Sequence, residues 1–166
     1  MLFRSALNRT APLGKEGVLS VEGNDGIRLP NGMYLKYPRL RITATENQKT
    51  GYVYDTKQGK SIAPTRIYGG KLIENICQAL ARIVIGDQLI MIAKKYPVVM
   101  TVHDAVACLV RRKDIWDGLQ FVDSCMKFTP SWAEGLPLSC ELGYGLSYAD
   151  AGNKKSITLH KHDFLK

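Results

Sequence analysis

The sequence has few of the features that mark secreted, membrane-spanning or zinc-binding proteins. Nowhere do 18 apolar residues follow one another, so no transmembrane helix is expected. Residues 1–14 contain Arg4 and Arg9 but lack the uninterrupted apolar stretch of a signal peptide. The few cysteines show no CxxC spacing, so we expect reduced, buried thiols of a cytosolic protein rather than a zinc site or disulfides. They are Cys77, Cys108, Cys125 and Cys140.

Acidic residues are scarce in the first part of the chain. The 166 residues carry a net charge of +8. Residues 1–71 contain twelve Lys and Arg against five Asp and Glu, residues 72–150 seven against nine, and residues 151–166 four against one. A basic region of this kind suits a polyanion such as DNA or RNA, although a basic surface that only confers solubility would look the same. The length and the 45% apolar content fit one globular domain or a large piece of one.

Short β segments and turns are predicted for residues 27–56. The segment 27–37 contains Asn31-Gly32, a strong hairpin signal between two alternating runs. Residues 39–45 and 51–56 are expected to form a second strand pair around a polar loop. These strands predict a twisted antiparallel sheet with Lys and Arg on its solvent face. Residues 1–26 show no clear pattern.

A long amphipathic helix is predicted within residues 66–93, and Arg66 is expected to precede it across a flexible entry, Tyr68-Gly69-Gly70. Its apolar stripe follows helical spacing, with Leu72, Ile76, Ala79, Leu80, Ile83 and Asp87 in line and Ile73 and Val84 beside them. The opposite face carries a row of amide and cationic side chains, Lys71, Asn75, Gln78 and Arg82. Such a row suits contact with a nucleic-acid backbone or base edge, although a solvated helix face is the commoner explanation.

One His-Asp pair interrupts an otherwise apolar, β-favouring stretch, residues 98–110. The sequence around His103-Asp104 leaves room only for a tight turn between two strands, so the pair is expected at a hairpin tip. A strand end holds a metal-binding carboxylate more precisely than a loop does. Asp is also among the commonest turn residues, which is the structural alternative. A phosphohydrolase with adjacent His and Asp ligands is rejected, because the other histidines, His160 and His162, lie in the polar tail.

The remaining segments complete a mixed architecture. The basic run 111–113 is followed by Asp114, which is expected to cap a second helix that ends at Thr129-Pro130. Residues 135–142 are predicted as a final strand, and residues 151–166 as a polar basic tail. The expected fold class is α+β, an antiparallel sheet and a hairpin packed against two main helices.

Four motifs in order resemble family A DNA polymerases, in particular their bacteriophage branch. Thr101-Val102-His103-Asp104 resembles the last catalytic motif of that family, and residues 66–82 resemble the palm helix that precedes it. Leu29-Pro30-Asn31-Gly32 with Tyr37-Pro38, and residues 132–138, fit the same branch in order and spacing. The resemblance covers residues 27–150 and implies the C-terminal palm portion of such a polymerase, with residues 1–26 as a separate N-terminal segment.

The resemblance also implies roles for individual residues in template-directed nucleotidyl transfer. The family uses two Mg²⁺ ions about 4 Å apart, and Asp104 is expected to hold them as one of two aspartates. His103 is expected beside the primer terminus. Gln78, with Asn75 or Glu74, is expected to face the minor groove of the primer-template DNA. Three cations, Arg66, Lys71 and Arg82, are expected to hold phosphates or sugars.

Two parts of the family pattern are missing. Ala105 stands where the family has glutamate, and no segment matches the first catalytic aspartate or the fingers helix that binds the deoxynucleoside triphosphate. The chain is therefore expected to be incomplete and inactive alone, and to need a second polymerase chain. The alternative is a non-catalytic DNA-binding domain that retains the palm fold. In both cases DNA binding should weaken with salt, and the host-cell cytoplasm is the expected location.

Overall fold

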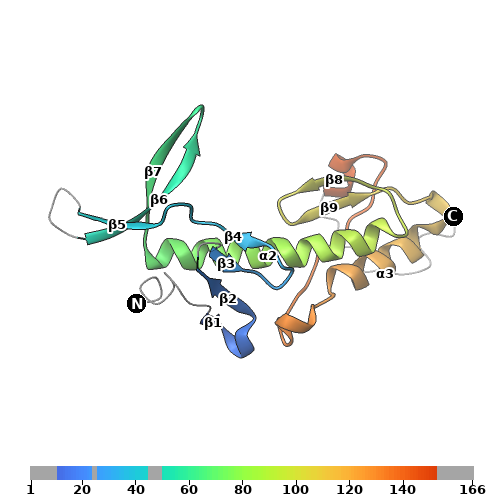
Figure 1. Ribbon diagram of the computed structural model, residues 1–166. Coiled ribbons are helices and arrows are strands. Elements are labelled where there is room, and N and C mark those ends of the chain that lie inside the picture. Colours follow the sequence, from blue (N-terminus) through green and yellow to red (C-terminus); the bar gives the residue numbers. More distant parts are fainter. Residues whose placement is uncertain (1–10, 24–25, 45–49, 153–166) are drawn as a thin grey trace. The chain divides into compact units, whose positions relative to one another are not determined.

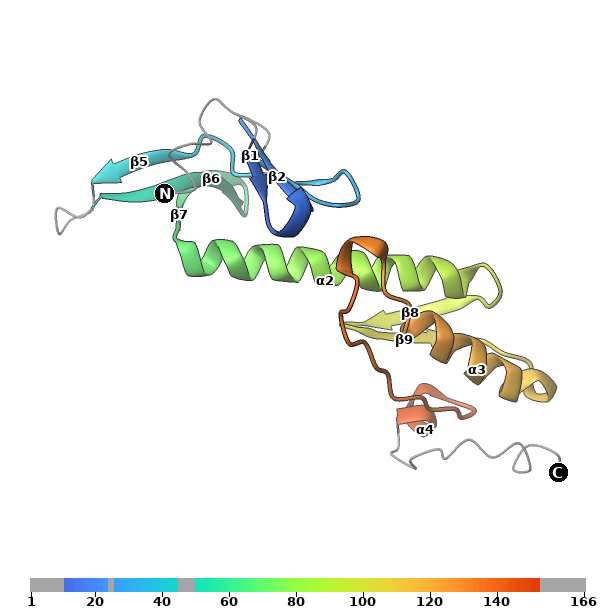
Figure 2. The ribbon, with the colours of Figure 1, turned by 90° about the horizontal axis from the view of Figure 1, so that it is seen from below.

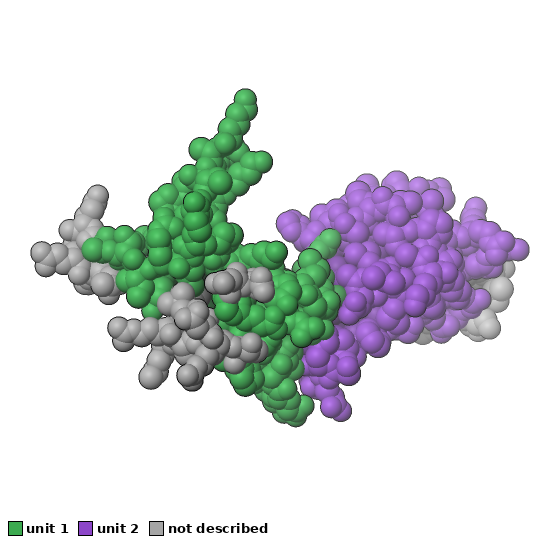
Figure 3. All heavy atoms as spheres, viewed as in Figure 1, with its two compact units in different colours: residues 1–83 green, residues 84–166 purple. Residues whose placement is uncertain are grey.

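A computed structural model describes residues 11–23, 26–44 and 50–152 of the chain (Figure 1). The polar tail with His160 and His162 lies outside the described residues. The fold is mixed α and β with antiparallel sheets, which confirms the predicted class. The chain divides into two compact units, residues 1–83 and 84–166 (Figure 3).

The first unit contains a four-stranded antiparallel sheet. It is formed by β1 (Ala11–Leu13), β2 (Leu19–Glu22), β3 (Gly26–Arg28) and β4 (Tyr34–Leu35), with the 3₁₀ turn η1 (Lys15–Gly17) between the first two strands. Leu19, Val21 and Ile27 are buried, because alternate residues of β2 and the centre of β3 point to one face. The hairpin predicted around Asn31-Gly32 is confirmed by the pairing of β3 with β4.

A second, three-stranded antiparallel sheet follows. Its strands are β5 (Arg41–Ala44), β6 (Thr50–Gln58) and β7 (Ser61–Ile67), in that order. The pairing of β5 with β6 confirms the second predicted hairpin. The prediction that residues 27–56 share one sheet is wrong, because β3–β4 pairs with β2 while β5–β6 pairs with β7. Strand β7 was not predicted, and it contains Arg66, which was expected to precede the helix.

The long helix α2 (Gly69–Ala93) confirms the predicted helix, and it includes residues 69–70, which were expected to belong to the flexible entry. Leu72, Ile83 and Val84 are buried as expected, whereas Ile73 is 63% exposed, because it lies at the edge of the apolar stripe. By length and hydropathy alone α2 would be able to cross a membrane, and 28% of the relevant window is buried, although the core helices of soluble proteins also pass the length and hydropathy test. One such helix is weak evidence for a membrane span, but the expectation that the chain has no transmembrane helix is not confirmed.

The second unit contains the last part of α2, a hairpin and a second helix. The hairpin consists of β8 (Val98–Val102) and β9 (Ala105–Cys108), and after the 3₁₀ turn η2 (Arg112–Asp114) comes α3 (Ile115–Met126). Figures 1 and 2 show the hairpin beside the last turns of α2. Two short elements follow, η3 (Ser131–Ala133) and α4 (Tyr148–Gly152).

Gln88 joins α2 to the end of α3. Its side chain is 1% exposed, and its amide nitrogen donates to the backbone carbonyls of Met126, at 2.7 Å, and Phe128, at 3.3 Å. Carbonyls in the last turn of a helix have no partner within the helix, so Gln88 supplies one from a neighbouring element. The Oε1 atom of Gln88 is buried without a hydrogen bond to any described residue.

Three local predictions for the second unit are corrected. Asp114 stands at the N-cap of α3, but its side chain makes no capping hydrogen bond and instead accepts one from Arg111 Nε at 2.7 Å. Residues 135–142 form no strand, since Gly135 has φ +83° and Pro137 has no backbone N–H to donate. Of the four cysteines only Cys125 is buried, and Cys77 is exposed.

Candidate nucleic-acid interface

The His-Asp pair occupies the two-residue tip of the β8–β9 hairpin, as predicted. Val102 pairs with Ala105, so His103 and Asp104 are the only residues of the turn. Both side chains are exposed. Within the part of the chain that the structure describes, neither makes a hydrogen bond or an ion pair. The tip therefore presents an imidazole and a carboxylate to solvent from a fixed backbone position.

The backbone at the tip is strained. His103 has φ +54°, in the left-handed region that favours glycine. For a non-glycine residue this conformation costs about 1–2 kcal/mol, although His is more frequent there than most residues. Such outliers gather at functional sites. The chain therefore keeps an imidazole at a position where glycine would be less strained.

Asp104 does not form a complete metal site with its described neighbours. No group of three or more His, Cys, Asp and Glu able to hold a metal is present in residues 11–23, 26–44 and 50–152. Mg²⁺ takes oxygen ligands and usually needs one or two carboxylates besides water and phosphate. Asp104 can supply one of them. The resemblance implies a second aspartate, and no segment of the chain matches the motif that carries it.

The polar face of α2 is organised around Glu74. Its Oε1 accepts a hydrogen bond from Lys71 Nζ at 2.9 Å and another from Gln78 Nε2 at 3.2 Å. The hydrogen bond from Lys71 and the charge of Glu74 raise the pKa of Lys71, which therefore stays protonated at neutral pH. Gln78 and Arg82 are exposed one and two turns further along. These side chains form an accessible row on one helix face, as predicted.

Asn75 has a different environment from its neighbours in the row. Its Nδ2 donates to the hydroxyl of Tyr37 at 3.1 Å, and the ring of Tyr37 packs edge-on against Tyr54 with centroids 5.0 Å apart. Burial raises the pKa of Tyr37, and the hydrogen bond from Asn75 opposes that shift. Asn75 thus ties α2 to the segment before β5 and to β6, and it is less available to a ligand than Gln78.

Arg66 lies on a basic face of the β5–β7 sheet. Arg41, Val53 and Arg66 stand opposite one another on adjacent strands, so their side chains share one face. Lys57 lies on the same face, four residues along β6 from Val53. In the sequence, the trace of this face is the alternation of side chains between the two faces of a strand at residues 51–58. That alternation identifies a basic face only once the partner strand β7 is known.

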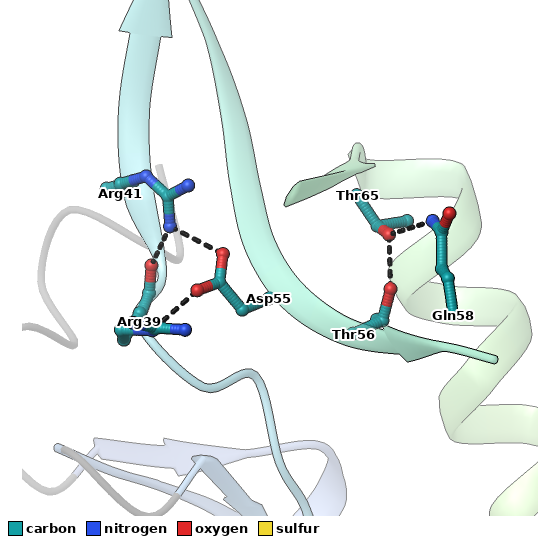
Figure 4. A network of polar contacts seen from close by, with 6 residues as sticks. All are labelled: Arg39, Arg41, Asp55, Thr56, Gln58 and Thr65. Carbon is teal, nitrogen blue, oxygen red and sulfur yellow. Dashed lines mark hydrogen bonds and ion pairs between the residues drawn. The ribbon is translucent and has the colours of Figure 1, made fainter. Parts of the chain in front are cut away.

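A single carboxylate holds two arginines at this face (Figure 4). Asp55 accepts from Arg41 Nη1 at 2.8 Å and pairs with Arg39 Nε at 2.5 Å, and the hydrogen bond from Arg41 lowers the pKa of Asp55. On the other face of the ribbon, the hydroxyls of Thr56 and Thr65 lie 2.5 Å apart. Sequence reasoning missed the Arg39–Asp55–Arg41 cluster, because Asp55 and the two arginines are separated along the chain.

Positive charge dominates the first unit. Its described residues, 11–23, 26–44 and 50–83, contain ten Lys and Arg against four Asp and Glu. The predicted site residues divide between the units. Arg66 and the α2 row belong to the first unit, and the His103-Asp104 tip to the second. Each unit on its own presents polar side chains suited to a nucleic acid.

Comparison with known proteins supports this interpretation at a coarse level. The DNA polymerase of Bacillus phage SP02 is 35% identical over 119 residues, which cover 69% of this chain and 18% of the phage protein. The sequence is similar to part of a phage DNA polymerase. The chain spans less than one fifth of that relative's length. No family model matches the chain, and no solved structure matches it.

This similarity bears on the predictions to different degrees. It supports the relationship to a phage DNA polymerase. The assignment to family A, the palm identity of residues 27–150 and the roles of single residues stay predictions.

Proposed function

We propose that the chain forms the C-terminal palm portion of a phage-type family A DNA polymerase and takes part in template-directed nucleotidyl transfer during DNA replication in the host-cell cytoplasm. The observation that carries this proposal is the exposed His103-Asp104 pair at a two-residue hairpin tip, in a chain similar to part of a phage DNA polymerase. Either feature alone has a simpler explanation. Together they favour a site at the tip over an ordinary turn.

The residues have distinct roles in this proposal. Asp104 contributes one carboxylate to the Mg²⁺ site, and His103 lies against the primer terminus. This role of His103 would explain why the chain tolerates a strained backbone at that position. On α2, exposed Gln78 reads the minor groove, whose acceptors are shared by all base pairs and so report pair geometry rather than sequence. Lys71 and Arg82 contact phosphates or sugars, and so does Arg66 on the basic face of the β5–β7 sheet.

A partner chain supplies what the described residues lack. The two-metal chemistry of the family requires a further carboxylate, and the deoxynucleoside triphosphate requires the fingers helix. Strand β8 supports the presence of a partner, because Val99, Met100 and Val102 are 56%, 37% and 39% exposed. An apolar strand in a two-stranded sheet is stabilised when another strand or surface covers it. Mg²⁺ would supply Lewis-acid chemistry once both chains provide ligands.

Primer extension tests the proposal. The chain is mixed with the product of a neighbouring polymerase-like gene, and extension of a labelled primer is followed with and without Mg²⁺. Asp104→Asn should reduce extension at least about 100-fold by removing a metal ligand, whereas the exposed control Glu141→Gln should leave it within about twofold. Full activity of the Asp104→Asn mixture would refute the metal role, and loss of activity in the Glu141→Gln mixture would show a general charge effect.

A non-catalytic DNA-binding domain is the second candidate. Ala105 in place of the family glutamate favours it, as does the lone carboxylate at the tip. This candidate predicts salt-sensitive DNA binding that Asp104→Asn leaves unchanged, and no extension with any polymerase partner. Binding that does not change between about 50 and 200 mM salt would contradict both candidates, because each relies on phosphate contacts.

A further inference from the structure

Cationic side chains of the second unit gather at the base of the hairpin. Residues 84–152 contain six Lys and Arg against eight Asp and Glu, a net charge of −2. Five of the six cations lie in two short segments, residues 94–95 at the end of α2 and residues 111–113 after β9. All five are exposed. An acidic unit thus concentrates its positive charge in one place.

The backbone brings these two segments together. The Leu109 amide donates to the Pro97 carbonyl at 2.9 Å, which extends the hairpin pairing beyond the ends of β8 and β9. Residues 95–97 and 109–111, with Asp114 and Asp117, line a groove of about 650 Å³. Strand β8 has five residues at roughly 3.3 Å each. The groove is therefore on the order of 16 Å along the strand from the His103-Asp104 tip, and it is a different site.

An aromatic cluster forms part of the groove. Tyr96 lines it and packs edge-on against Phe121, with ring centroids 5.7 Å apart. Lys95 Nζ lies 4.7 Å from the Phe121 centroid and 5.3 Å from the Tyr96 centroid. These contacts hold the ammonium group of Lys95 beside an aromatic wall. Leu109, 61% exposed, adds an apolar side chain to the same groove.

The two carboxylates of the groove lining balance its two cations, Lys95 and Arg111, so the excess of positive charge lies on the residues next to the lining. Asp114 accepts a hydrogen bond from Arg111 Nε, and the Arg111 side chain remains 78% exposed. This contact uses Nε, and among the described residues the terminal nitrogens of Arg111 make no hydrogen bond, so they are available to a phosphate. The three exposed cations next to lining residues in sequence, Lys94, Arg112 and Lys113, therefore give the segments around the groove a net charge of +3.

We propose that this groove binds a single-stranded segment of nucleic acid. A positive groove that follows the backbone, with an aromatic or apolar wall for the bases, is the arrangement that binds single strands without sequence preference. A duplex keeps the flat faces of its bases stacked inside, so it has no base face to pack against Tyr96 and Leu109. The proposal is independent of Asp104 and of nucleotidyl transfer.

Binding of labelled oligonucleotides to the full-length chain tests the proposal. Fluorescence anisotropy is measured without Mg²⁺ for an eight-nucleotide oligo(dT) and for a duplex of matched length. The groove variant replaces Lys94, Arg112 and Lys113 by Gln, because these exposed residues adjoin the groove lining in sequence and carry its excess of positive charge. The matched control replaces Lys57, Lys60 and Arg66 of the first unit by Gln. A third variant, Leu109→Glu, places a carboxylate in the groove at an exposed position.

The groove variant should weaken oligo(dT) binding at least about tenfold at 0.1 M salt, since each lost contact to a single strand removes about 0.7 from the slope of log affinity against log salt. Its duplex affinity should change less than threefold, and Leu109→Glu should show the same selectivity. The control should weaken duplex binding more than oligo(dT) binding. Equal losses of both affinities in the groove variant and the control would overturn the proposal, as would unchanged oligo(dT) binding in Leu109→Glu.

Failure of this experiment and failure of the proposed polymerase role are distinguishable. If the Asp104→Asn mixture remains fully active while the groove variant loses oligo(dT) binding, the groove is a binding site in a protein whose tip holds no catalytic metal. If the groove variant binds oligo(dT) like the unmodified chain, the groove proposal is wrong whatever the result of primer extension.

Discussion

The side chain of Gln88 links α2 to the end of α3, and its replacement should cost far more than its size suggests. Gln88→Met keeps the length and flexibility of the side chain but removes both donors. Two hydrogen bonds of about 1 kcal/mol each are lost, with the 3.3 Å bond to Phe128 the weaker of the two. Removal of the unpaired Oε1 recovers part of that. We expect Gln88→Met to lower the free energy of unfolding by about 1–2 kcal/mol.

Gln88→Glu separates the hydrogen-bond contribution from packing. The carboxylate would face two carbonyl oxygens at a position that is 1% exposed, so burial should raise its pKa in the folded state above the unfolded value of about 4.3. Each unit of that increase costs about 1.4 kcal/mol at high pH. The variant should be nearest to Gln88→Met in stability below about pH 4, where the acid is neutral in both states, and should lose stability as the pH rises to 8.

Urea unfolding followed by tryptophan fluorescence measures these changes. Both tryptophans, Trp116 and Trp132, belong to the second unit, so the signal reports the unit that contains Gln88. The matched control is Gln120→Glu, the same chemical change at an exposed position of α3. A Gln88→Glu deficit that stays constant from pH 4 to pH 8, or that equals the deficit of Gln120→Glu, would refute the assigned hydrogen bonds.

Two further predictions follow from backbone strain and from thiol ionisation. His103→Gly should stabilise the hairpin by up to about 1 kcal/mol, because glycine adopts φ +54° without strain. The control Asp104→Gly should not stabilise it. Urea unfolding of both variants measures the difference, and a destabilised His103→Gly would contradict the strained turn. Burial, and after it the hydrogen bond to Asp123, raises the pKa of Cys140 to about 11. Only about 0.1% of its thiol is therefore ionised at pH 8. Because the folded state keeps a proton that the unfolded state loses, stability should fall as the pH rises from about 9 to about 11. Mass spectrometry after timed iodoacetamide treatment at pH 8 should find Cys77 labelled well before Cys140. Asp123→Asn should speed the labelling of Cys140. Equal labelling rates for the two thiols in the unmodified chain would contradict the raised pKa of Cys140.

Local patterns predicted the elements whose signal lies within a few residues. The Asn31-Gly32 turn, the tip at His103-Asp104 and the stripe of α2 depend on φ/ψ preferences and on helical spacing, and each is found in the structure. The prediction of a strand at residues 135–142 was wrong for a local reason. Gly135 and Pro137 disfavour a strand more than the alternating apolar residues around them favour one. The prediction that all four cysteines are buried was wrong, because apolar neighbours in sequence do not fix which side of a helix or strand faces the core.

The amino-acid sequence by itself determined the hairpin turns, the long helix, the exposed His-Asp pair and the excess of positive charge before residue 72, because each arises from neighbouring residues or from composition. Only the tertiary structure decided which strands share a sheet, that Arg41 and Arg66 lie on one face of it, and that Lys95 and Arg111 line one groove. These features depend on pairing between distant segments, whose loop-closure entropy and register no local pattern encodes.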